Sequence, residues 1–170
     1  SLNAGMRAGI VPGNLGGYLY ALERFGTMTI AEVFAPAIEY AENGYPIDPM
    51  LAQSIARGRN NLAKYPTTAK IFLPDGEPIK AGELYRNPDY AATLRKLVEA
   101  EQQAKAKGAT RSAAIQAAFD RFYKGDIAQE FDRFFKANGG VLTAADLAAY
   151  APKWTEPLHT SYRVHEVYSN

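Results

Sequence analysis

Residues 122–150 read FYKGDIAQEFDRFFKANGGVLTAADLAAY, and their order of turn, capping and apolar residues predicts two helices. Gly125 permits a turn, and Asp126 with Gln129 three residues later is typical of a helix cap. The Asn-Gly-Gly at 138–140 is typical of a helix end. The apolar residues between these signals share one helical face, which we expect to be buried: Ile127, Phe131, Phe134 and Phe135.

A shorter helix is predicted directly after this one. Thr143 with Asp146 three residues later resembles a capping box, and the helix would run through Tyr150. Pro152 prevents it from continuing, because proline lacks a backbone N–H and its ring clashes with the preceding turn. Each polar residue in this part of the chain therefore has a structural role, and none is an obvious catalyst.

Length and composition favour one folded globular domain. The 170 residues are 47% hydrophobic, yet no run approaches the roughly 18 apolar residues of a membrane span. The formal net charge of +1 provides no electrostatic footprint for nucleic acid or an anionic membrane. Because these residues include no cysteine, they exclude disulfides, thiolate nucleophiles and cysteine-containing zinc sites within them.

Capping and periodicity predict further helices over residues 14–25, 29–44, 48–65 and 87–98. The expected caps are Asn14, Thr29 with Glu32, Asp48 and Asn87, and Pro36 is expected to kink the second of these helices. The residues expected on the buried faces are Leu15, Tyr18, Leu19 and Leu22; Ile30, Val33, Phe34, Ala37, Ile38 and Ala41; Leu51, Ile55 and Leu62; and Tyr90, Leu94, Leu97 and Val98.

Two segments lack this pattern. Residues 66–87 contain the turn Pro-Asp-Gly-Glu at 74–77, which predicts an exposed loop with a small hairpin. Residues 99–111 are almost all Ala, Glu, Gln and Lys, which predicts a helix that projects into solvent because it has little to bury. An apolar stripe then resumes with Ile115, Ala118, Phe119 and Phe122.

Residues 158–168 are rich in β-branched and aromatic side chains, which favours a strand or a hairpin. We therefore expect a mainly α fold in two parts: helices over residues 1–153, and a β segment over 154–170. A strand that reaches Asn170 has no later partner, so both ends are expected to be cut edges of a longer protein.

Taken in order, these motifs resemble the γ-glutamyltranspeptidase family, also called glutathione hydrolases, among the N-terminal-nucleophile hydrolases. Residues 99–118 are longer than the family pattern, and Val164 replaces a frequent glycine, which indicates a divergent member. The matching motifs are VPG at 11–13, FGT at 25–27, APAI at 35–38, AENGY at 41–45, IFL at 71–73, GEP at 76–78, AATL at 91–94, FYKGDIA at 122–128, GGVLT at 139–143, DLAAY at 146–150, YR at 162–163 and VY at 167–168.

The resemblance implies a part of the large subunit of an αββα enzyme. Such a precursor cuts itself and exposes a threonine that attacks the γ-glutamyl group of glutathione or related amides, without metal or cofactor. The arginine that binds the substrate carboxylate is expected upstream of Ser1, and the oxyanion hole downstream of Asn170. The resemblance thus places no catalytic, cofactor-binding or metal residue in this chain, whose partner would be the small subunit of the same precursor.

Further expectations follow from the resemblance. The γ-glutamyl substrate would bind only the intact enzyme, and the compartment would be periplasmic or extracellular. Two alternatives stay open: a related acylase acting on glutaryl or cephalosporin side chains, and a helical interaction module without an enzymatic parent. An exposed apolar face would favour an enzymatic parent of either kind, and a closed polar surface would favour the interaction module.

Several residues have the chemistry of a site but are expected to be structural or exposed. Ser1 could act as an N-terminal nucleophile, but residues 2–5 indicate loose coil. His159 and His165 would lie on one face of an extended strand about 20 Å apart, too far to share a metal ion, so we expect surface histidines. Other rejected groups are the carboxylate pairs Glu39 with Glu42 and Asp120 with Asp132, which we expect on solvated faces, and a basic docking face of Lys105, Lys107 and Arg111.

Overall fold

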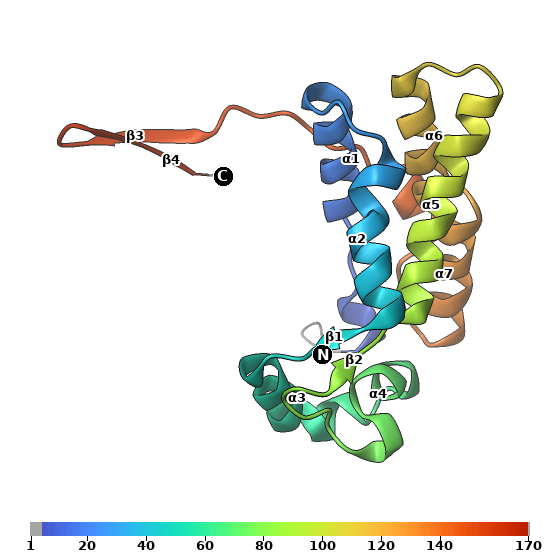
Figure 1. Cartoon of the computed structure of the whole chain (residues 1–170), viewed down its shortest axis with the longest axis vertical. Coiled ribbons are helices and arrows are strands. Elements are labelled where there is room, and N and C mark those ends of the chain that lie inside the picture. Colours follow the sequence, from blue (N-terminus) through green and yellow to red (C-terminus); the bar gives the residue numbers. More distant parts are fainter. Residues whose placement is uncertain (1–4, 170) are drawn as a thin grey trace.

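The computed structural model describes residues 5–169, which form a helical bundle, a smaller helical unit and a projecting hairpin (Figure 1). The bundle contains α1 (Asn14–Phe25), α2 (Ile30–Asn43), α5 (Pro88–Ala106), α6 (Arg111–Tyr123), α7 (Asp126–Ala137) and α8 (Ala144–Ala148). The smaller unit contains α3 (Pro49–Leu62), α4 (Pro66–Phe72), the 3₁₀ turn Pro74–Gly76, and the short strands β1 (Tyr45–Pro46) and β2 (Leu84–Tyr85). The hairpin is β3 (Leu158–Tyr162) and β4 (His165–Ser169), and a 3₁₀ turn at Met6–Ala8 precedes α1. The prediction of a mainly α fold with a small C-terminal β element is confirmed.

The main core lies where α1 and α2 pack against α5, α6, α7 and α8 (Figure 1). Tyr123, at its centre, stacks on Tyr150, and the two ring centroids are 4.8 Å apart. The predicted apolar stripe of α6 lies in this core, and of the predicted α7 face Ile127, Phe131 and Phe135 lie in or against it. Its buried members are Leu19, Ile30, Leu97, Ile115, Ala118, Phe119, Phe122, Tyr123, Ile127, Ala128, Leu142 and Leu147.

Most of the predicted caps are confirmed. Thr29 and Thr143 each form a complete capping box, with Glu32 and Asp146 respectively. The side chains of Asp48 and Asn87 also accept backbone N–H groups at the starts of α3 and α5. The α2 helix continues through Pro36 to Asn43, and Gly44 ends it with a positive φ of 88°.

Two predicted caps are wrong. Gly13 precedes α1 without a side-chain cap, so Asn14 is the first helical residue. Gly125 likewise precedes α7 without a side-chain cap, so Asp126 is the first helical residue of α7. The carboxylate of Asp126 instead receives hydrogen bonds of 3.0 Å from both Arg121 and Lys96. A stronger cationic partner on a neighbouring helix has replaced the local cap.

The prediction of an exposed loop at 66–87 is also wrong. Residues 71–72 are helical within α4, and the side chains of Leu73 and Ile79 are buried against α3. Proline at the first position of α4 favours this helix, because its φ angle is already helical. Only the turn at 74–76 was placed correctly, and β1 pairs with β2 rather than with a neighbour inside the segment.

The prediction that residues 99–111 project into solvent is wrong. The α5 helix runs on to Ala106, Gly108 reverses the chain with a φ of 84°, and α6 returns along α5 (Figure 1). Glu101 in this segment is only 1% exposed. The amino-acid composition was correctly interpreted as helical, but the buried side was missed because its partners lie on α1 and α2.

The C-terminal β segment is an antiparallel hairpin that extends away from the bundle (Figure 1). Its register pairs His159 with Tyr168 and Tyr162 with His165. Every described residue of β3 and β4 is exposed. Between residues 5 and 169, no helix is long and apolar enough to cross a membrane.

Candidate interaction surface

The α1 helix carries apolar side chains on two faces. Leu19 is buried in the core, and Leu15 and Leu22 pack beside it. A second stripe, at spacings of three and four residues, is exposed: Tyr18, Ala21 and Phe25. The side chains of Tyr18 and Phe25 are 69% and 63% exposed. The expectation that Tyr18 is buried is therefore wrong within this structure, although its periodicity was correctly identified.

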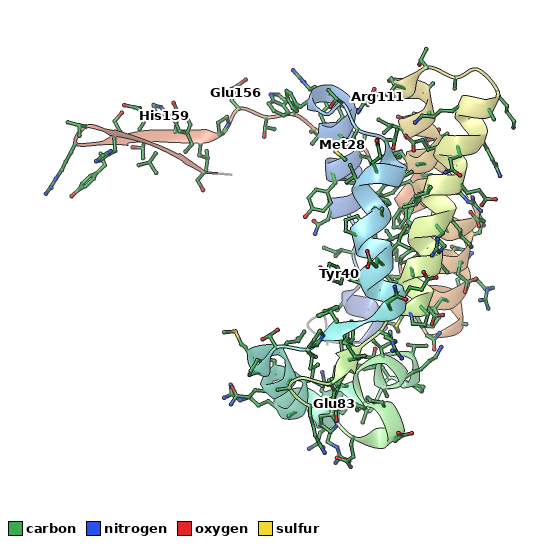
Figure 2. All side chains as sticks on the ribbon, viewed as in Figure 1. Met28, Tyr40, Glu83, Arg111, Glu156 and His159 are labelled. Carbon is green, nitrogen blue, oxygen red and sulfur yellow. The ribbon has the colours of Figure 1, made fainter. Side chains whose placement is uncertain are left out.

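The α2 helix has the same two-sided character. Its buried face is formed by Ile30, Ile38 and Ala41, with Phe34 partly buried beside them. Its exposed stripe is Val33, Ala37 and Tyr40, so the prediction that Val33 and Ala37 are buried is wrong. Tyr40 points from α2 toward the side on which the hairpin and the α3–α4 unit extend (Figure 2). A surface helix of a closed domain normally has only one apolar stripe.

The hairpin adds further exposed apolar side chains. A two-stranded hairpin is at best marginally stable on its own, and its free edges can pair with another strand. Its large exposed apolar residues are Leu158, Tyr162, Val164, Val167 and Tyr168. We call these residues and the exposed stripes of α1 and α2 together the apolar surface. Groups of large exposed apolar side chains are typical of surfaces that another polypeptide covers.

A small cavity continues this surface at the end of α2. Its volume is about 350 Å³, and four tyrosines with Ala37, Ala41 and Asn87 line it: Tyr40, Tyr45, Tyr85 and Tyr90. The ring of Tyr45 meets the rings of Tyr40 and Tyr85 edge to face, with centroids 6.1 and 5.6 Å away. Burial raises the pKa of Tyr85. The cavity can accept an apolar side chain, but its lining provides neither a base nor an activated nucleophile. Tyr90, expected on a buried face, is 52% exposed here.

A larger cavity of about 690 Å³ lies between the start of α4 and the end of α7. Lys64 is the one charged residue of its lining, which otherwise consists of Gly5, Met6, Tyr65, Pro66, Thr67, Thr68, Phe134, Phe135 and Asn138. It contains no carboxylate or histidine for acid–base chemistry. Ser1, considered above as a nucleophile, lies outside the described residues.

The histidines lie on the hairpin surface, as expected, but not on one strand. His159 belongs to β3, where Figure 2 shows it on the hairpin, and His165 belongs to β4. The Nε2 atom of His159 contacts the carboxylate of Glu166. The single-strand geometry expected for them is therefore wrong. Within the described residues 5–169, no cluster of three or more metal-binding side chains was found.

Members of both carboxylate pairs form ion pairs with basic residues. Glu42 pairs with Arg95 on α5. Asp120 pairs with Lys124, at 2.8 Å, one helical turn away. Asp132 has two partners: Lys136 at 2.6 Å and the backbone N–H of Ala144 at 3.1 Å. The hydrogen bond from Lys136 is the main reason that the pKa of Asp132 lies below its ordinary value. Glu42, Asp120 and Asp132 thus each have a cationic partner.

The proposed basic residues do not form a docking face. Lys105 binds the buried carboxylate of Glu101 at 2.9 Å. Arg111 donates to the backbone carbonyls of Leu22 at 2.8 Å and Met28 at 3.1 Å. Sequence reasoning missed the roles of both Glu101 and Arg111, because each binds backbone atoms more than 60 residues away and nothing near it in sequence indicates this.

The chain was compared with known families, relatives and solved structures. A family model described as Gamma-glutamyltranspeptidase matches residues 1–170. Among curated relatives, the Acylase ACY 1 proenzyme of Pseudomonas sp. (strain SE83) is 37% identical over 163 residues, which cover 96% of this chain and 26% of the relative. The Glutathione hydrolase proenzyme of Escherichia coli (strain K12) is 31% identical over 170 residues, covering 99% and 26%.

Two solved structures show the same arrangement of elements. The Helicobacter pylori gamma-glutamyltranspeptidase superposes with a TM-score of 0.83 at 30% identity, covering 99% of this chain and 44% of that one. The cephalosporin acylase from Bacillus halodurans superposes with a TM-score of 0.76 at 31% identity, covering 92% and 27%. The chain thus spans about a quarter of the length of these two curated relatives.

Proposed function

Because this chain belongs to the γ-glutamyltranspeptidase family, which is a family of enzymes, we propose that it is a scaffold segment of a larger γ-glutamyl-transferring or γ-glutamyl-hydrolysing enzyme. The observation that carries this proposal is the second apolar stripe on α1 and on α2. Val33, Ala37 and Tyr40 are exposed on a helix whose opposite face is already packed. Further polypeptide of the same enzyme, above all its small subunit, would cover these residues.

In the proposed mechanism the chemistry lies outside these 170 residues. A precursor cleaves itself and exposes a threonine whose hydroxyl attacks the γ-glutamyl carbonyl carbon, while the threonine's own α-amine accepts the hydroxyl proton. The amide nitrogen leaves as an amine, and water or a second amine then releases the acyl group. Relatives named as proenzymes support the precursor part of this proposal.

The contribution of this chain would be structural. The apolar surface would pack on the core of the enzyme, and burial of apolar area is worth about 25 cal/mol per Å². The hairpin would offer its free strand edges to a larger sheet. We assign no residue of this chain to a reacting group, a cofactor or a metal, and the chain by itself would be inactive.

A second candidate is an acylase that removes a glutaryl or cephalosporin side chain. The similarity to the Acylase ACY 1 proenzyme, at 37% identity, favours it over the 31% found for the glutathione hydrolase. Both candidates share the acyl-enzyme chemistry, so the same scaffold would serve either. The exposed apolar stripes argue against the third alternative, a self-contained helical module with a closed polar surface.

The test uses the full-length protein that contains these residues. Mass spectrometry would follow its cleavage into two chains, and release of a chromophore from γ-glutamyl and glutaryl amides would report activity. We expect cleavage and a preference for one of the two acyl groups, which selects between the candidates. An intact protein that releases neither acyl group would overturn both.

A further inference from the structure

Trp154 lies in the connection between α8 and β3, where its ring contacts the end of α1. The ring centroids of Trp154 and Phe25 are 5.5 Å apart, with their planes tilted by 51°. The guanidinium carbon of Arg24 lies 4.7 Å from the centroid of the Trp154 ring and 5.5 Å from that of Phe25. Both distances fall within the range of a cation–π interaction, for which tryptophan is the best acceptor. Two rings and one cation thus join this connection to α1.

The turn that carries these contacts is itself held from α6. Arg111 donates to the carbonyls of Leu22 at 2.8 Å and Glu23 at 3.2 Å, in the last turn of α1. It also donates to the carbonyl of Met28, and Figure 2 shows Arg111 and Met28 at the same end of the bundle. A cation beside the last carbonyls of a helix is favourable because those groups carry partial negative charge. Arg111 therefore fixes the backbone from which Arg24 and Phe25 extend.

Within the described residues 5–169, burial does not determine the direction of the hairpin. All residues of β3 and β4 are exposed, and residues 151–157 before them have no helix or strand. The contact of Trp154 lies between the bundle and this extended segment. A small set of side-chain contacts can therefore determine where the hairpin points.

We propose that Trp154 is a latch that closes between Arg24 and Phe25 and sets the direction of the β3–β4 hairpin, and that Arg111 holds the turn into which it closes. The inference rests on these contacts and not on the function proposed above. It assigns a role to part of residues 99–118, the segment longer than the family pattern.

Spin labels can measure the direction of the hairpin directly. Because the sequence contains no cysteine, Ala92→Cys on the exposed side of α5 and Val164→Cys in the hairpin turn would carry the only two labels on the 170-residue chain. We expect a narrow distribution of label–label distances, broadened by Trp154→Ala. Phe25→Ala should broaden it as well. A distribution that is already broad before these substitutions, or that Trp154→Ala leaves unchanged, would overturn the latch.

Fluorescence provides a second measurement, because Trp154 is the sole tryptophan. In Arg24→Gln, the ratio of latched to free Trp154 should fall about two- to fivefold, as expected for an exposed cation–π contact, and acrylamide quenching should increase accordingly. Arg111→Gln should act in the same direction although Arg111 does not touch the ring. Arg133→Gln is the matched control, since Arg133 pairs with Glu130 on α7. Circular dichroism confirms that each variant is folded. If Arg111→Gln leaves the quenching at the level of the control, Arg111 does not hold the turn and that part of the proposal is overturned.

Discussion

The carboxylate of Glu101 on α5 accepts a 3.1 Å hydrogen bond from the backbone N–H of Ile30, the first residue of α2. Its other oxygen accepts the N–H of Ala31 at 3.3 Å. Lys105 contacts the same oxygen as Ile30 does, at 2.9 Å. A negative charge at a helix N-terminus satisfies N–H groups that have no partner in the helix and complements the helix dipole. Glu101 thus completes, from another helix, the cap that Thr29 begins locally.

We expect Glu101→Ala to lower the free energy of unfolding by about 2 to 3 kcal/mol, because it leaves buried backbone donors without an acceptor. Glu101→Gln should cost less, since it keeps one acceptor oxygen. Urea denaturation of the chain measures both changes. Glu130→Ala removes an exposed glutamate from a surface ion pair and should leave the denaturation midpoint unchanged. Equal effects of Glu101→Ala and Glu130→Ala would contradict the buried cap.

Two neighbouring glycines of α1 should respond in opposite directions to alanine. A Cβ atom at Gly16 would lie 2.6 Å from the ring of Tyr150 and 3.0 Å from that of Phe119. A Cβ atom at Gly17 would meet nothing within 4 Å. Gly16→Ala should therefore destabilise the fold by about 1 to 3 kcal/mol through overpacking. Gly17→Ala should stabilise it by about 0.4 to 1 kcal/mol, because it lowers the entropy of the unfolded chain.

Thermal unfolding of the two alanine variants, followed by circular dichroism, tests this pair. The two substitutions are chemically identical and lie in the same helical turn, so each is the control for the other. A shift of both melting temperatures in the same direction would contradict the packing of Gly16 against Tyr150.

The pH dependence of stability should report the ion pairs of Asp126. The hydrogen bond from Arg121, with a further one from Lys96, lowers the pKa of Asp126 below the ordinary 3.8. A lowered pKa in the folded state stabilises the fold above the unfolded value, and this contribution is lost as pH falls through the folded value. The stability difference between the unmodified chain and Asp126→Asn should be constant above pH 3.8 and shrink below it.

Urea denaturation at a series of pH values measures this difference. The same comparison in an Arg121→Gln background is the control, because the largest cause of the shift is then absent and the pH-dependent part should become smaller. A difference that stays the same at every pH would show that Asp126 titrates alike in the folded and unfolded chain.

Substitutions on the exposed stripe of α2 should weaken its contact with another polypeptide without destabilising the fold. Val33 and Tyr40 are 40% and 60% exposed, so Val33→Glu and Tyr40→Glu should change the stability of the 170-residue chain little. They should reduce its binding of an apolar dye. In the full-length protein, the same substitutions should weaken association with the small subunit that we propose as the partner, because they would bury a charge.

Size-exclusion chromatography and co-purification of the two subunits measure this association. Glu39→Gln is the control, as Glu39 is exposed on the same helix but outside the stripe. Normal assembly of a Val33→Glu, Tyr40→Glu double variant would exclude the stripe of α2 as a contact surface.

The sequence predicted best those features whose partners are close along the chain. The capping boxes at Thr29 and Thr143 each need a partner three residues away, and both were found. Helix ends at Gly44 and at 138–140 follow from a backbone conformation that glycine adopts at little cost. Asp126 failed as a cap because cations of α5 and α6, which the local pattern does not include, compete for its carboxylate.

Periodicity identified the helices, but it could not assign every apolar side chain to the buried or the exposed face of its helix. Tyr18, Val33 and Tyr90 repeat at helical spacing and yet are exposed. Each helix of this kind has two apolar faces, so the pattern alone does not tell which face the chain itself buries. The helix over residues 66–72 was not predicted, because the turn-forming sequence Pro-Asp-Gly that follows it indicates a loop.

By itself the sequence determined the mainly α fold, most caps and the family, because these depend on hydrogen bonds within one turn and on motifs in a fixed order. Only the tertiary structure decided that Glu101 and Arg111 are embedded in the fold, and that a second apolar face on α1 and α2 remains open. A charged side chain is buried only where distant backbone groups supply its hydrogen bonds, and those groups meet it only when the helices pack.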